Sequence, residues 1–397
     1  GTYLSLQLTV QGVSAQIIGI VMSANFFGML LGAFQCHRLI KSVGHIRAFT
    51  AFAALATAIV MLHGINSSPI FWGILRFLTG FSIIGLYMVL ESWLNECTQP
   101  NSRGKVLAIY MVMSYMGMAI GQQLLNLGNT FNLQILYIVG FVLVLCLVPV
   151  AVTHSIHPVT PEFEHLNVIE LFRKTPTGML GCFSAGLLNS AFYAIGPVFC
   201  YQIGLTISEL SMVMTVTILG GMLLQWPVGA ISDKFDRTYV LAFIGILTAL
   251  ISVAILYLAG NSYYLFLFLM SLFGGLVFTL YPVSVARAHD VFEAKDVVAV
   301  SSALLFSYGA GATIGPVLAS TIMSVSDTAY GLFVFCSVVS ALYGFITFFL
   351  RNRQIITVVA AEDNSAFVVM KNSSPVASAI DPRIEADEET DGAVHKE

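Results

Sequence analysis

Residues 238–260 read TYVLAFIGILTALISVAILYLAG, a run of apolar residues without a charged side chain. A helix of about 20 such residues is long enough to cross the hydrocarbon core of a bilayer, which is about 30 Å thick. The run is continuous, whereas strands of a membrane barrel alternate in hydrophobicity over about ten residues. This stretch therefore predicts a transmembrane helix and points to an all-α polytopic membrane protein.

Runs of the same kind recur along the whole chain, with a short one at its start (1–10). The predicted spans are 15–36, 45–64, 69–96, 103–127, 131–152, 177–203, 207–230, 238–260, 262–287, 298–324 and 328–350. The composition agrees, because 57% of the 397 residues are hydrophobic and 10% are charged, against about 25% charged in a soluble domain. The mean hydropathy is +0.86. A soluble globular protein is therefore excluded, and a net charge of −4 argues against a nucleic-acid partner.

Basic residues test this arrangement, because they concentrate on the cytoplasmic side of membrane proteins. Arg76 apart, they fall in alternate loops and after the last span: Arg38, Lys41, Arg47, Arg103, Lys105, Arg173, Lys174, Lys234, Arg237, Arg287, Lys295, Arg351, Arg353, Lys371, Arg383 and Lys396. The intervening loops contain none. The pattern predicts that these loops and the C-terminus are cytoplasmic.

The two halves of the chain resemble each other. Ser114-Tyr115 matches Ser307-Tyr308, and the Gly-Met-Leu-Leu run at Gly28 matches the one at Gly221, in both cases 193 residues apart. Six spans separate the copies, so the halves are parallel, as in many transporters. The same spacing puts the start of the first half about sixteen residues before Gly1. We therefore expect most of the first helix to lie outside this sequence and the intact protein to have twelve helices.

These patterns divide the chain into four parts. Residues 1–152 form the N-terminal half, 153–176 a cytoplasmic linker, 177–350 the C-terminal half and 351–397 a tail. From Glu362 onward the tail has nine acidic and three basic residues and few large apolar ones. Such a composition predicts a disordered acidic tail in the cytoplasm.

Motifs for catalysis and for cofactors are missing from the sequence. It lacks a Gly-x4-Gly-Lys-Ser/Thr phosphate loop, a His-Glu-x-x-His, a Gly-x-Ser-x-Gly and a Cys-x-x-Cys motif. His154 and His157 lie in the linker, where no further spacing typical of structural zinc follows. We therefore expect no enzyme, no catalytic residue, no metal and no cofactor.

Five stretches resemble the major facilitator superfamily. They are the loop from Gly229 to Arg237 (GAISDKFDR), the Arg-x-x-x-Gly of Arg76 and Gly80, and the runs ESWLN at Glu91, RGKVLAIY at Arg103 and GQQ at Gly121. The last three runs are similar to the YcaD-type subgroup, bacterial transporters whose substrates are largely unassigned. The resemblance covers the chain to about Arg353 and implies two parallel six-helix halves in the bacterial inner membrane.

The sequence departs from the family pattern at two places. In the first-half loop, from Gly32 to Arg47, the signature Asp is replaced, so a gate built on that Asp does not transfer. In span five Gly121 precedes Gln122, where drug/proton antiporters of the family carry Gly-Pro. This weakens the assignment to multidrug antiporters.

Two ionisable residues lie well inside a span, Arg76 and Glu91, both in 69–96. A charge at this depth costs at least about 2.5 kcal/mol, so it indicates a functional or bracing role. Gly80 and Tyr87 share their helix face, which we interpret as facing a central cavity. Arg76 either anchors a substrate, supports proton coupling or braces the helix. Glu91 either carries a coupling proton or pairs with Arg38, Lys41 or Arg287 in a gate, which we favour.

Two further sets of residues complete the candidate site. The resemblance implies a cytoplasmic gate motif of Gly229, Asp233, Lys234 and Arg237, joined by Arg38 and Lys41. Polar and aromatic residues on the spans that line the cavity in the family are Asn25, Tyr87, Tyr115, Gln122, Gln123, Asn189, Tyr193, Gln225, Trp226, Tyr281 and Tyr308. Any one of them is also able to act as a contact between helices.

The predicted function is secondary transport of a small molecule by alternating access, driven by protons, with efflux favoured over uptake. We expect a monomer in the lipid bilayer. The alternatives are a sensor or receptor on the same fold, an uptake symporter for a metabolite, and a membrane enzyme or lipid scramblase.

Overall fold

The structure is a computed structural model that describes residues 1–99, 102–127, 133–152, 168–292, 297–353, 364, 367–369 and 373–380. Every regular element in these ranges is a helix. The α-helices are α1 (Thr2–Val10), α2 (Ala15–Val43), α3 (His45–Leu62), α4 (Pro69–Cys97), α5 (Arg103–Gln123), α6 (Gln134–Leu145), α7 (Leu147–Val152), α8 (Val168–Lys174), α9 (Pro176–Gln202), α10 (Ile207–Lys234), α11 (Arg237–Leu258), α12 (Tyr263–His289), α13 (Val297–Val325) and α14 (Gly331–Asn352). Two short 3-10 helices are η2 (Leu124–Leu127) and η5 (Pro375–Ile380).

Ten helices of the described part of the chain are long and apolar enough to cross a membrane. They match ten of the predicted spans and confirm the all-α membrane fold. The predicted span 131–152 differs, because it is split into α6 and α7 at Cys146. Pro149 explains the break: it has no N–H to donate to the carbonyl of Leu145, and its ring crowds that carbonyl.

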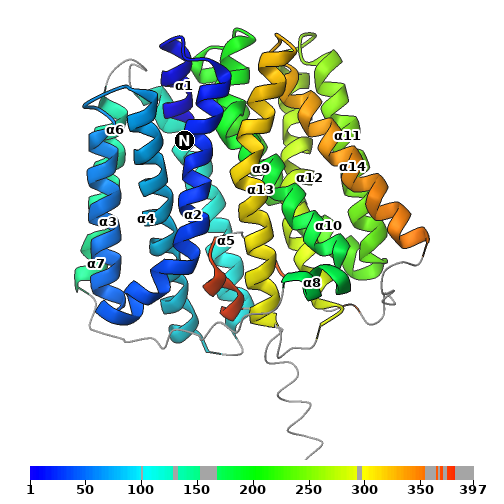
Figure 1. Ribbon diagram of the computed structural model, residues 1–397, viewed down its shortest axis with the longest axis horizontal. Helices are drawn as coiled ribbons and strands as arrows, with labels where there is room; N and C mark the ends of the chain where they lie inside the picture. Colours follow the sequence, from blue (N-terminus) through cyan, green and yellow to red (C-terminus); the bar gives the residue numbers. More distant parts are fainter. Residues whose placement is uncertain are drawn as a thin grey trace, which may run out of the picture.

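The helices of residues 1–152 and those of residues 176–352 form two groups that stand side by side. In Figure 1 the first group, blue to cyan, lies on the left and the second, green to orange, on the right. Contacts between the groups run along α2 with α13 and along α5 with α10. We call the end of the bundle that carries Arg38, Arg103, Lys174 and Arg351 the basic end.

The internal repeat is visible in how the helices pack. In the first group α2 packs along α4, and in the second group α10 packs along α12. A Cβ added at Gly80 would overlap the carbonyl oxygen of Asn25, and one added at Gly274 would overlap that of Thr217. Glycine at these two positions lets the backbones approach closely, and the two positions are 194 residues apart.

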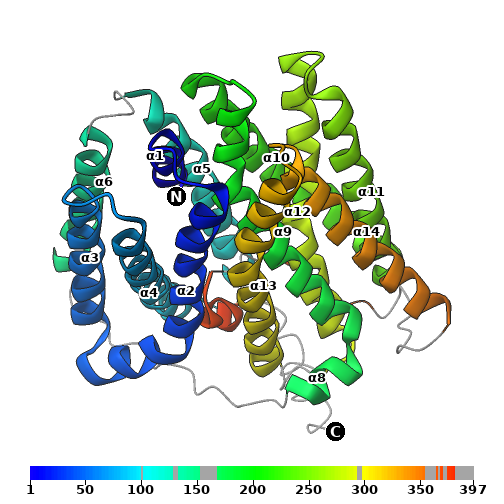
Figure 2. The same ribbon diagram turned by 45° about the horizontal axis from the view of Figure 1, so that its top comes forward.

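The linker and the tail are only partly described. Residues 153–167 of the predicted linker lie outside the described ranges, and α8 lies within the rest of it. The tail differs from the predicted disorder where it is described. Ser373, Ser374, Val376 and Ala377 are buried, and η5 packs against α4 and α13. Figure 2 places η5, drawn in red, between the two groups of helices. The acidic composition hid this contact, because the apolar residues that make it are few.

Candidate functional site

Aromatic rings from both groups of helices meet in the middle of the bundle. Phe278 of α12 stacks on Tyr193 of α9, with ring centroids 5.7 Å apart, and on Tyr115 of α5, at 6.3 Å. Tyr281 of α12 lies edge-on to Tyr308 of α13 at 5.3 Å. We call Tyr115, Tyr193, Phe278, Tyr281 and Tyr308 the central aromatic cluster.

Two hydroxyls of this cluster, those of Tyr115 and Tyr308, have amide partners. Gln225 of α10 donates from Nε2 to the hydroxyl oxygen of Tyr115 at 2.6 Å, a contact that crosses from one half to the other. The Tyr308 hydroxyl is hydrogen-bonded to Asn189 of α9. Both amides are buried. The arrangement therefore combines apolar ring faces with a few oriented polar groups, as small-molecule sites do.

Most of the predicted cavity residues thus come together. The structure brings Tyr115, Asn189, Tyr193, Gln225, Tyr281 and Tyr308 into contact and places Tyr87 within electrostatic range of Tyr193. Phe278 was not predicted, although it lies one helical turn before Tyr281 and so shares its face. The repeat relates Tyr115 to Tyr308 and Tyr87 to Tyr281 at spacings of 193 and 194.

Four predicted cavity residues lie elsewhere. Trp226 is 80% exposed, so it does not belong to the buried cluster. Asn25 is half-buried and donates to the Met29 sulfur at 3.7 Å, one turn along its own helix. Gln122 accepts a hydrogen bond from Thr2 at 2.8 Å, and Gln123 contacts α10. Their positions on polar helices were predicted, but the face that each helix turns inward was not.

Polar side chains join the halves at the end of the bundle opposite the basic end. Gln123 donates from Nε2 to Thr215 Oγ1 at 2.6 Å, and Asn126 donates to Ser211 Oγ at 3.0 Å. Nearer the middle of the bundle, Ser23 of α2 donates to the carbonyl oxygen of Thr313 of α13. The contacts of Gln123 and Asn126 close this end with hydrogen bonds between groups that have no charge.

Arg76 lies in the second turn of α4 and is 8% exposed. Its Nε has no hydrogen-bond partner, and no ion pair joins it to an acid among the described residues. His63, just past the end of α3, lies within its electrostatic range and packs edge-on against Trp72 at 5.5 Å. Burial, followed by the charge of Arg76, lowers the pKa of His63 to about 4, despite the hydrogen bond to the Ile59 carbonyl.

Glu91 lies near the basic end of α4 and is fully buried. Its carboxylate accepts hydrogen bonds from the Tyr110 hydroxyl at 2.8 Å and from Ser374 of the tail. Arg287, one of the cations expected near it, donates to Thr238 Oγ1 at 3.1 Å in the second half. Tyr110 and Ser374 were not identified from the sequence, since nothing in the local pattern links either residue to Glu91.

The gate motif lies at the basic end of the second half. Arg237 forms ion pairs with Asp233, at 2.5 Å, and with Asp290 at the end of α12. Asp236 accepts from Arg351 at 2.5 Å. Partial burial would raise the pKa of Asp236, but its hydrogen bonds with Arg351 and the Thr238 N–H outweigh this and hold that pKa below its usual range. The motif thus ties α10, α11, α12 and α14 together.

The other gate residues take two positions. Lys234, Arg38 and Lys41 are exposed at the basic end. Gly229 is buried on α10, and the ring of Phe367 from the tail lies where a Cβ at this position would point. The predicted gate residues therefore share one end of the bundle, where the tail also lies.

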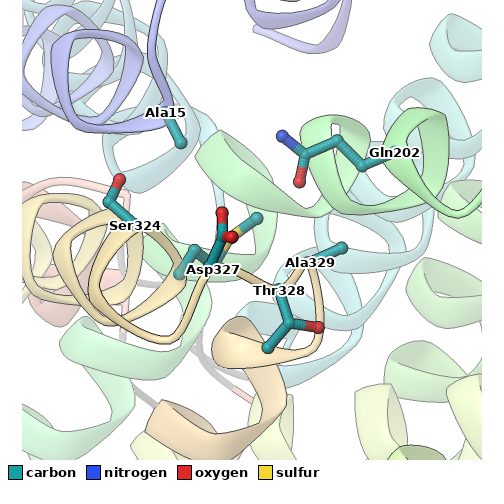
Figure 3. Close-up of a pocket in the computed structure, with 7 residues that line it drawn as sticks. Ala15, Gln202, Ser324, Asp327, Thr328 and Ala329 are labelled. Carbon is teal, nitrogen blue, oxygen red and sulfur yellow. The ribbon is translucent and has the colours of Figure 1, made fainter.

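A pocket of about 400 Å³ opens at the end opposite the basic end. It is lined by Ala15, Gln202, Met323, Ser324, Asp327, Thr328 and Ala329. Figure 3 shows the Asp327 carboxylate pointing into the space between Ala15 and Gln202. The pocket contains none of the residues predicted for the cavity and lies apart from the central aromatic cluster.

The ten long apolar helices and the repeated packing of two helix groups define a polytopic membrane protein with two related halves. The sequence model of the Major Facilitator Superfamily matches residues 2–206 and 178–378. The chain belongs to this family, as its sequence motifs predicted.

Curated relatives agree with the resemblance to the YcaD-type subgroup. An uncharacterized MFS-type transporter of Yersinia enterocolitica is 30% identical over 350 residues, covering 86% of this chain and 88% of the relative. The uncharacterized MFS-type transporter YcaD of Escherichia coli is 29% identical over 358 residues, covering 88% and 90%. The chain is therefore similar to these transporters along most of its length.

Solved transporters share the fold at low sequence identity. A bacterial homolog of the human lysosomal transporter Spinster, in an inward-facing and occupied conformation, gives a TM-score of 0.71 at 14% identity and covers 92% of this chain and 94% of its own. The nucleoside transporter NupG gives a TM-score of 0.70 at 14% identity, covering 87% and 94%. Together with the family assignment, these matches identify a membrane transporter.

Proposed function

We propose that the protein is a secondary active transporter that exports a small molecule across the bacterial inner membrane in exchange for protons. The two halves rock about the central aromatic cluster and expose it to each side in turn. The observation that carries this proposal is the buried contact between Gln225 and Tyr115, because polar and aromatic groups meet there across the boundary between the halves. The protein works as a monomer, with its basic end and C-terminus in the cytoplasm.

The contacts at the outer end suit a gate that opens and closes. Each is a hydrogen bond between groups without charge, such as Gln123 with Thr215 and Asn126 with Ser211. The net contribution of such a hydrogen bond to the stability of the closed state is about 0.5–1.5 kcal/mol, because water replaces the lost partner when the gate opens. A few of them therefore hold the outer end shut without locking it.

The two intramembrane charges take the roles of substrate anchor and gate. Arg76 lies in the outer part of α4 and offers a buried cation to a substrate or a coupling step. Glu91 lies near the cytoplasmic end, where its hydrogen bond with the Tyr110 hydroxyl supports closure of the inner side. If Glu91 is not the gate, it is the residue that couples transport to protons.

The loop of Asp233, Lys234 and Arg237 supports the inner gate. Its ion pairs hold the ends of α10, α11 and α12 in one position relative to each other. In this proposal they keep the second half rigid while it rocks, so the exchange between states takes place at the boundary between halves.

Transport is tested in liposomes that contain the protein and an internal pH-sensitive dye. A proton gradient is imposed, and pools of metabolites and of amphiphilic drugs are added in turn. We expect at least one pool to move protons in liposomes with protein and not in empty ones. A folded protein whose melting temperature shifts with a pool that moves neither protons nor solute would overturn transport and favour the sensor.

Two variants then separate the roles of the residues. Glu91→Gln keeps the shape but removes the charge, so a coupling role predicts solute exchange without proton movement. A gate role predicts that both slow together. Tyr193→Ala opens the central aromatic cluster and is expected to raise KM, whereas the exposed Trp226→Ala serves as the matched aromatic control.

A further inference from the structure

Part of the C-terminal tail lies inside the helix bundle. The described residues of this part are 364, 367–369 and 373–380, and we call them the tail segment. Figure 1 shows η5, in red, between α2 and α13 near the basic end, and Figure 2 shows the same placement after rotation. Ser373, Ser374, Val376 and Ala377 are between 1% and 4% exposed, as buried as residues of the helix core.

The tail segment first contacts the second half, at the loop that carries the family signature. Asn364 donates from Nδ2 to the carbonyl oxygens of Ser232, at 3.3 Å, and Phe235, at 3.2 Å. The Phe367 N–H donates to Asp233 Oδ1 at 3.0 Å, and the Phe367 ring covers Gly229. The segment therefore binds both the carboxylate and the glycine of the signature.

The tail segment then crosses to the first half. Val368 and Val369 pack on Leu107 and Met111, two buried residues of α5. Ser374 donates its hydroxyl to the Glu91 carboxylate.

The tail segment ends in the apolar core of the first half. Val376 is 2% exposed and lies in the cluster formed by Cys36, Ile40, Ala48, Phe49, Phe52, Ala53, Ile84, Met88 and Val89. From there η5 also reaches α13 of the second half.

The tail segment therefore contacts both halves at the basic end and bridges them there. At the opposite end they are joined by Gln123 with Thr215 and Asn126 with Ser211. With the tail segment in place, polar and apolar contacts therefore cross the boundary between halves at both ends of the bundle. Rocking of one half on the other would have to break the contacts of Phe367, Ser374 and Val376 with their respective halves.

We propose that the tail segment is an autoinhibitory plug that occupies the cytoplasmic mouth between the halves and must leave before the transporter turns over. The plug covers Glu91 and ties the signature loop to α4 and α5. It would thereby regulate the site described under the proposed function, on which this inference rests. Seven acidic residues follow Ile380 in the sequence, and release requires only the short apolar part of the tail segment to dissociate.

The test measures access to the covered surface and needs no substrate. In a variant with the six native cysteines replaced by serine, Met111→Cys places a reporter thiol under Val368 and Val369. Inside-out membrane vesicles are treated with a maleimide coupled to a polyethylene glycol chain. We expect slow labelling in the full chain and labelling at least tenfold faster after deletion of 362–397 or in Val376→Asp.

Two controls separate release of the plug from misfolding. Val152→Asp carries the same change at a residue that is 76% exposed, and we expect the labelling rate of the full chain. A synthetic peptide of residues 362–397 added to the deletion variant is expected to restore protection, which a misfolded protein would not allow. Equal labelling of the full chain and the deletion variant would overturn the plug.

Flux measurements decide whether the plug inhibits. With a pool of compounds that drives proton movement through the protein in liposomes, we expect the deletion variant to move protons several-fold faster than the full chain. Protection of the reporter thiol by the tail together with unchanged flux would overturn the inhibitory role. Protection by the tail with no flux in either protein would instead reject the proposed transport, so the two failures are distinguishable.

Discussion

Arg237 and Asp290 form an ion pair in which both side chains are fully buried. Arg237 begins α11 and Asp290 follows the last residue of α12, so the pair joins two helices at positions far apart in sequence. Arg237 also binds Asp233 of α10 at 2.5 Å. Arg237 therefore joins three helices of the second half, α10, α11 and α12.

Breaking this pair is expected to destabilise the protein strongly. Asp290→Asn leaves the buried guanidinium of Arg237 with one acidic partner fewer, and losing one partner of a buried pair costs about 3–5 kcal/mol. We expect the melting temperature in detergent to fall clearly. Asp236→Asn is the control, because its pair with Arg351 is partly exposed and is worth about 1 kcal/mol or less. Equal losses in the two variants would contradict the ranking.

Gly80 is expected to tolerate no larger residue. A Cβ there would overlap the carbonyl oxygen of Asn25, so Gly80→Val forces α2 and α4 apart. Overpacking of this kind costs about 1–3 kcal/mol. Gly73→Ala on the same helix is the control, since nothing lies within 4 Å of its added Cβ. Thermal unfolding of both variants measures the difference, and a stable Gly80→Val would refute the close approach.

Gln225 and Tyr115 are expected to be energetically coupled. Tyr115→Phe removes one acceptor of the buried Gln225 amide, and leaving a buried polar group unsatisfied costs about 1–3 kcal/mol. The double variant Tyr115→Phe, Gln225→Leu removes both partners, so it should lose less than the sum of the single variants. A double-mutant cycle on unfolding measures this coupling. Strict additivity would mean that the contact across the halves contributes nothing.

His63 is expected to make stability depend on pH. Its pKa in the folded protein is lowered to about 4, against about 6.5 when unfolded. Between these two pH values the unfolded chain binds a proton at His63 more readily than the folded protein does. The contribution of neutral His63 to the free energy of unfolding is therefore complete above pH 6.5 and is lost as the pH falls toward 4. The loss is of the order of 3 kcal/mol. In His63→Phe, which keeps a ring against Trp72, melting curves from pH 7 to 4.5 should decline less steeply.

Several features of the site followed from local pattern. Tyr115 and Tyr308 were identifiable because the same dipeptide recurs 193 residues later, and parallel halves bring such pairs to the centre of the bundle. Arg76 and Glu91 stood out because intramembrane charges are costly and therefore rare. Trp226 lies outside the buried cluster: an aromatic residue next to the buried Gln225 fits a cavity by type, but its side chain is 80% exposed.

The sequence by itself determined the membrane class, the spans, the repeat and the family, because each depends on runs, periods and motifs that are local in the chain. Tertiary structure alone decided which residues meet: Gln225 with Tyr115, Arg237 with Asp290, and Ser374 with Glu91, the last pair 283 residues apart. Hydrophobic patterning in a membrane helix reports burial in lipid or protein alike, so it does not specify which neighbour a face contacts. Those neighbours are set by the packing of glycines, rings and buried charges across helices that only the folded chain brings together.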